Sequence, residues 1–78
     1  MNENLNDVIA SDNNRAKDRA LYAISVKENI AAGTLTDIDH AMDLLNEMKN
    51  ESKLDELGIS AEIKTKLIAG IDEIISSC

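Results

Sequence analysis

The clearest pattern of apolar positions in the chain lies in its middle, where an apolar residue recurs every three or four positions. Its members are Leu35, Ile38, Met42, Leu45 and Met48. This spacing places the side chains on one face of an α-helix, so we predict a helix over about residues 35–50. Thr34 or Thr36 would be its N-cap, because hydroxyl side chains accept hydrogen bonds from the first free backbone N–H groups.

Apolar residues at helical spacing also predict a helix before this one, over about residues 14–32. One face of this helix holds alanine and isoleucine side chains: Ala16, Ala20, Ala23, Ile24, Ile30 and Ala31. Glycine readily adopts the left-handed conformation that closes many helices, so we expect the helix to end at Gly33. Because alanine projects little from the backbone, this face would let another helix approach closely.

A third apolar pattern covers the last part of the chain and is broader than the others. It comprises Ile59, Ile63, Leu67, Ile68, Ile71, Ile74 and Ile75. With Ser60 as N-cap, these residues predict a helix over about residues 61–76. They span roughly 180° of its circumference, whereas a helix with a single buried side needs a narrower stripe. We therefore predict that this helix is the central one of a bundle. The alternative is an oligomer interface that uses Ile68 and Ile75.

Two shorter segments complete the pattern. Leu5, Val8 and Ile9 predict a short N-terminal helix, and residues 54–58 a short helical turn that ends in glycine. The chain has no proline, tryptophan or phenylalanine, and few β-branched residues alternate with polar ones, so β-structure is not expected. We predict an all-α protein with a single domain over residues 1–78. It would form a compact bundle of three main helices with a short N-terminal helix.

Charge adds most to this picture in the middle of the chain. The formal net charge is −7, and residues 34–58 hold seven acidic and two basic side chains. Four of these acids recur every four positions, opposite the apolar stripe and next to His40: Asp39, Asp43, Glu47 and Glu51. Like charges at this spacing on a helix repel one another. Two interpretations are open: a solvated face that keeps the protein soluble, or a docking surface for a basic protein.

Several classes of function are not expected. Direct contact with nucleic acid needs Lys and Arg for the phosphates, which the net negative charge opposes. No apolar run is long enough to cross a membrane, and the first residues lack the features of a signal peptide. The single cysteine, Cys78, cannot form an internal disulfide, so we expect a cytoplasmic protein. No nucleophile lies near a base in the sequence pattern, so we expect neither an enzyme nor a cofactor.

Together these features predict a small, acidic, non-enzymatic protein–protein interaction module. We expect a regulator or inhibitor that binds a basic protein through the row of four acids and His40. One alternative is a self-associating assembly protein, a homodimer, that uses its Ile-rich C-terminal helix. Another is a binder of a divalent metal or small ligand around Asp37, His40 and Asp43, although helical metal sites draw further ligands from other helices. Small size and acidity are typical of accessory proteins of bacteria and their phages.

Overall fold

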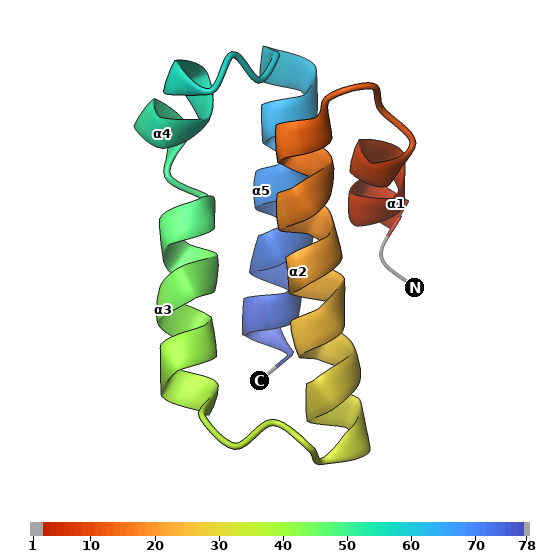
Figure 1. Cartoon of the computed structure of the whole chain (residues 1–78), viewed down its shortest axis with the longest axis vertical. Coiled ribbons are helices and arrows are strands. Elements are labelled where there is room, and N and C mark those ends of the chain that lie inside the picture. The colour runs from red at the N-terminus through yellow and green to blue at the C-terminus, as the bar shows by residue number, and fades with distance from the viewer. Residues whose placement is uncertain (1–2, 78) are drawn as a thin grey trace.

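The structure is a computed structural model that describes residues 3–77, so the expectation for Cys78 lies outside the described residues. Five helices follow one another, and the described residues contain no strand. They are α1 (Glu3–Ile9), α2 (Asn14–Ala32), α3 (Ile38–Met48), α4 (Glu51–Glu56) and α5 (Ala61–Ser76). Figure 1 shows the longer helices α2, α3 and α5 side by side, with α1 and α4 at their flanks. The all-α fold is confirmed, and α2 and α5 have the bounds that the sequence predicts.

Local capping explains why α2 begins and ends where it does. Asn13 precedes the helix in extended conformation, and its side-chain Oδ1 accepts hydrogen bonds from the backbone N–H groups of Arg15 and Ala16, both at 3.1 Å. At the other end, Gly33 has a φ of 71°, and its N–H donates to the carbonyl oxygens of Asn29 and Ile30. Both ends therefore satisfy backbone groups that a helix leaves unpaired.

Replacing Asn13 by alanine is expected to lower the free energy of unfolding by about 1 kcal/mol, because two N–H groups of the first turn lose their acceptor. Urea denaturation followed by far-ultraviolet circular dichroism measures the change. The matched control is Asn14→Ala, which alters the exposed first residue of α2 and leaves the cap in place. Equal losses in the two variants would contradict the capping role of Asn13.

The start of α3 differs from the prediction. The helix begins at Ile38, and its N-cap is Asp37, whose Oδ1 accepts a hydrogen bond from the N–H of His40 at 2.9 Å. Thr34 is not a cap of α3. Its backbone N–H and its hydroxyl both donate to the carbonyl oxygen of Asn29, at 2.9 and 3.3 Å. Thr34 thus completes the end of α2, and the following helix can begin only after the intervening loop.

The end of α3 also differs from the prediction. α3 ends at Met48 instead of Asn50, and α4 starts at Glu51 instead of Leu54. The side-chain Oδ1 of Asn50 accepts a hydrogen bond from the backbone N–H of Lys53 at 3.2 Å. Asn50 therefore caps the start of a new helix, so the predicted single helix over residues 35–50 is shorter at both ends.

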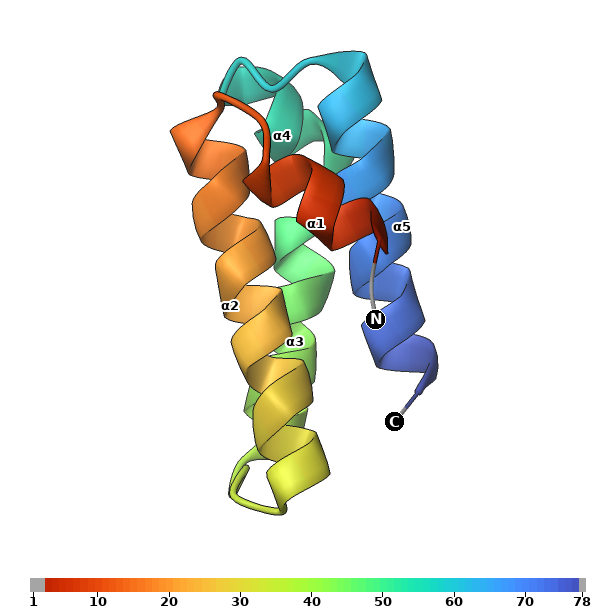
Figure 2. The same cartoon turned by 90° about the vertical axis from the view of Figure 1, so that its right-hand side faces the viewer.

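The hydrophobic core draws on all five helices and on the turn before α5. Its buried members are Leu5, Val8, Ala16, Ala20, Ala23, Val26, Ala41, Leu45, Leu54, Ile59, Leu67, Ile71 and Ile74. α5 packs against α1, α2 and α3, which confirms its predicted central position. Figure 2 shows α1 lying across α2 and α5.

The buried face of α3 is rotated relative to the predicted stripe. Ala41 and Leu45 are buried, and Met42 and Met48 pack against the core with part of their surface exposed. Ile38, predicted to belong to the stripe, is 47% exposed at the start of the helix. The small side chain of Ala41 adds little to the apolar pattern of the sequence, yet it lies on the side where α3 meets the core.

Candidate functional site

Three of the four predicted acids share the outer face of α3. Asp39, Asp43 and Glu47 are exposed, and each lies one turn from the next on the side opposite the buried Ala41 and Leu45. The rotation of 100° per residue brings positions four apart into line along a helix. We call these three residues the acidic face of α3.

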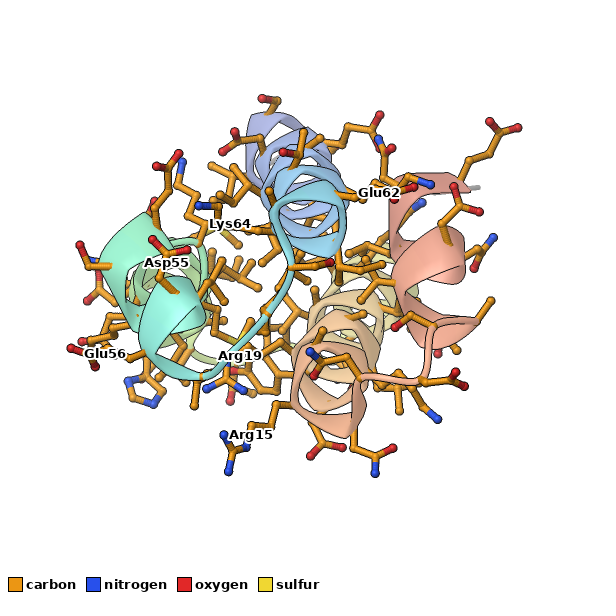
Figure 3. All side chains as sticks on the ribbon, turned by 90° about the horizontal axis from the view of Figure 1, so that it is seen from above. Arg15, Arg19, Asp55, Glu56, Glu62 and Lys64 are labelled. Atoms are coloured by element: carbon orange, nitrogen blue, oxygen red, sulfur yellow. The ribbon has the colours of Figure 1, made fainter. Side chains whose placement is uncertain are left out.

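Glu51 does not belong to this face, which corrects the prediction of four acids in one helical row. It is the first residue of α4 and follows the Asn50 cap. Its negative charge acts instead on Lys64 of α5. The hydrogen bond from Lys64 to Asp55 at 2.9 Å raises the pKa of Lys64 above its ordinary value, and the negative charges of Asp55 and Glu51 contribute to the rise. Figure 3 shows Lys64 and Asp55 pointing toward one another between α5 and α4.

Ion pairs in the described part of the chain involve other acids. They are Lys49–Asp72, Lys64–Asp55, Lys66–Asp7 and Lys66–Glu62. These pairs connect α5 with α4, with α1 and with Lys49 just after α3, and the last of them lies within α5. Among the described residues, the acidic face of α3 thus contributes to no ion pair. Within residues 3–77, its charges therefore make none of the ion pairs that join the helices.

Two basic side chains lie at one end of the acidic face. A hollow of about 120 Å³ is lined by Arg19, Glu47, Met48 and Lys53, from α2, α3 and α4. Figure 3 shows Arg19 reaching from α2 toward α4, and its Nη1 donates to the carbonyl oxygen of Arg15 at 3.0 Å. Arg19 and Lys53 therefore offset the negative charge of the face near Glu47 more than they do near Asp39 and Asp43. No sequence pattern predicts this arrangement, because three helices must come together to form it.

His40 is exposed near the acidic face, and its predicted metal-binding partners are not gathered around it. The carboxylate of Asp37 is the N-cap of α3 and accepts the hydrogen bond from the N–H of His40. No three His, Cys, Asp or Glu side chains within the described residues lie close enough together to hold a metal ion. The predicted residues Asp37, His40 and Asp43 are therefore not brought together as a group of three ligands among residues 3–77.

The predicted oligomer interface is partly used within the protein itself. Ile68 and Ile75 both pack against the core and are half-buried. Their packing accounts for part of the wide apolar arc of α5 without a second copy of the chain. Self-association through these two residues stays a prediction.

A larger hollow lies away from the acidic face. It has a volume of about 720 Å³ and is lined by Lys27, Ala69, Asp72, Glu73, Ile74, Ser76 and Ser77. None of the predicted site residues is among them. Separately, no helix in the described residues is both long and apolar enough to cross a membrane.

The acidic face of α3 is thus the arrangement that combines exposure, aligned charge and the lack of an ion pair within the described residues. No family model, no curated protein and no solved structure matches the chain.

Proposed function

We propose that this protein is a small regulator or inhibitor that binds a basic protein through the acidic face of α3. One observation carries the proposal: Asp39, Asp43 and Glu47 are exposed and aligned, yet they take no part in the ion pairs of the described residues. Acids that serve the fold, such as Asp55 and Asp72, are paired with lysines of neighbouring elements.

The physical argument rests on the cost of leaving these charges without a counter-charge. Like charges one turn apart on a helix destabilise it by a few tenths of a kcal/mol per pair. Lysine or arginine side chains of a partner would relieve this repulsion and add attraction of their own. A row of uniform charge also steers an oppositely charged partner toward the surface, and such association weakens as salt screens the charges.

Replacing Asp43 by lysine separates the two interpretations of the acidic face. Asp43 lies one turn from both Asp39 and Glu47, so the change converts two repulsive pairs into attractive ones. We expect the free energy of unfolding to rise by about 0.5 kcal/mol or more, as measured by urea denaturation. A basic partner should nevertheless bind less well, because the middle of its docking surface now carries a positive charge.

The matched control is Glu28→Lys, which makes the same change in net charge on α2. Glu28 is exposed, is in no ion pair of the described residues, and has no acidic residue one turn away. We expect its stability to change by less than about 0.5 kcal/mol. A stability gain in this variant equal to that of Asp43→Lys would show that net charge, and not the row on α3, is responsible.

The binding test uses the immobilised chain and a lysate of the cells that produce it, at low and at high salt. We expect a basic protein to be retained at low salt by the unaltered chain and by Glu28→Lys, and to be lost from Asp43→Lys. Mass spectrometry identifies the retained protein. Retention that is the same for all three chains, or loss from both variants alike, would contradict docking on the acidic face.

A further inference from the structure

The five helices are not held together equally. α1, α2 and α5 pack closely against one another, whereas α3 approaches α2 and α5 less closely and α4 lies close along no other helix. Figure 1 shows α3 and α4 following one another on the side of the bundle opposite α1. The fold thus consists of a tight group of three helices and a second segment, residues 38–56, that we call the α3–α4 arm.

Small side chains contribute to this difference. Alanines Ala16, Ala20 and Ala23 are fully buried on α2, and Gly70 is buried on α5, so these backbones can come close together. α3 instead meets the core through Ala41 and the longer Leu45, flanked by the partly buried Met42 and Met48. Long side chains keep a helix further from its neighbours. The flexible methionines also pack less specifically than branched residues.

The contacts between the arm and α5 include two ion pairs at the surface. Lys49 pairs with Asp72, and Lys64 pairs with Asp55, and all four side chains retain solvent exposure. Exposed ion pairs contribute little free energy and are weakened by salt. The buried apolar contribution of the arm itself is confined to Ala41, Leu45 and Leu54, whereas the rest of the core belongs to the other elements.

The helices on either side of the arm satisfy the backbone groups at their own ends, and one further hydrogen bond links α2 to the end of the arm, from Nη1 of Arg15 to the carbonyl oxygen of Leu57 at 3.2 Å. Gly33 and Thr34 satisfy the last carbonyl groups of α2, and Ser60 accepts the N–H of Ile63 at the start of α5. The turn between the arm and α5 contains Gly58, at a φ of 75°. The arm can therefore move away without leaving the ends of α2 or α5 unsatisfied.

We propose that the α3–α4 arm detaches from α1, α2 and α5 as a unit while those three helices stay folded together. Local opening of this kind uses the elements with the fewest buried contacts. Detachment uncovers the apolar core among which Leu45 and Leu54 are buried, and it moves the acidic face of α3 with the arm. The proposal concerns the motion alone and holds whether or not the acidic face binds a partner.

Native-state hydrogen exchange on the full chain, read amide by amide by NMR, tests the proposal. We expect the amides of α3 and α4 to share one opening equilibrium that is at least about tenfold more populated than that of α2 and α5. Added salt should raise the opening of the arm. If all helices exchange through one common opening, or if α3 and α4 open independently, the proposal is wrong.

A variant outside the arm supplies a second test. Asp72→Asn removes the negative charge that pairs with Lys49, and it lies on α5, outside the arm. We expect about a twofold to fivefold increase in the exchange of α3 and α4, with α2 unchanged. The control is Glu73→Gln, an adjacent exposed acid that is in no ion pair of the described residues. Equal acceleration of α2 in Asp72→Asn would overturn the proposal.

Discussion

Replacing Leu67 by alanine is expected to remove about 3 kcal/mol from the free energy of unfolding. Leu67 is fully buried on α5, the helix that contacts α1, α2 and α3. Shortening a buried leucine loses its transfer free energy and leaves a cavity, at a cost of about 2–5 kcal/mol. A domain of this size has a total stability of roughly 4–12 kcal/mol. A large fraction of the stability therefore depends on this one side chain. Urea denaturation measures the loss, with the free energy of unfolding expected to fall with urea concentration at the same slope in both proteins.

Leu21→Ala is the matched control for this experiment. Leu21 lies on α2 and is 51% exposed, so the same chemical change removes little buried surface. The expected change in the free energy of unfolding is below about 0.5 kcal/mol. A loss as large as that of Leu67→Ala would contradict the assignment of this side of α2 to solvent. Dependence of that loss on protein concentration would show that a second copy of the chain covers Leu21.

Replacing Ala20 by leucine is expected to lower the free energy of unfolding by about 1–3 kcal/mol, in spite of the added apolar surface. Ala20 is fully buried where α2 packs closely against its neighbours. A larger side chain at this position forces the helices apart and strains rotamers nearby. The loss is measured by the same denaturation experiment, and thermal unfolding gives an independent value.

Ala32→Leu provides the comparison for Ala20→Leu. Ala32 is exposed in the last turn of α2, and leucine is nearly as good a helix former as alanine. We expect a change within about 0.5 kcal/mol of zero. If Ala20→Leu is tolerated as well as Ala32→Leu, the close packing of α1, α2 and α5 is not a requirement of the fold.

The parts of the fold that the sequence predicts are those set by local interactions. Gly33 closes α2 through its own left-handed conformation, and Ser60 begins α5 through a hydrogen bond to a residue three positions away. The errors lie where neighbouring residues compete for the same role. Thr34 and Asp37 can both cap a helix, and Thr34 instead bonds back to the carbonyl of Asn29. Which of the two residues caps α3 depends on the path of the loop between the helices, and the sequence pattern does not predict that path.

In the candidate site, too, local interactions are predicted from the sequence and the packing of helices is not. Asp39, Asp43 and Glu47 share a face because helical periodicity puts them there, and periodicity is visible in the sequence. Glu51 leaves that row because Asn50 starts a new helix. Lys53 and Glu47 line the same hollow because of the way the helices pack, and the pattern within one segment of sequence does not predict that packing.

The central position of α5 has a consequence for the order in which the protein is made. The ribosome synthesises α1 to α4 before α5, yet Leu67, Ile71 and Ile74 of α5 are buried members of the core that those helices share. Until α5 has left the exit tunnel, Leu5 of α1 and Leu45 of α3 lack a complete core to enter. Folding of this unit therefore follows the synthesis of α5, and the nascent helices keep apolar surface open to chaperones during that interval.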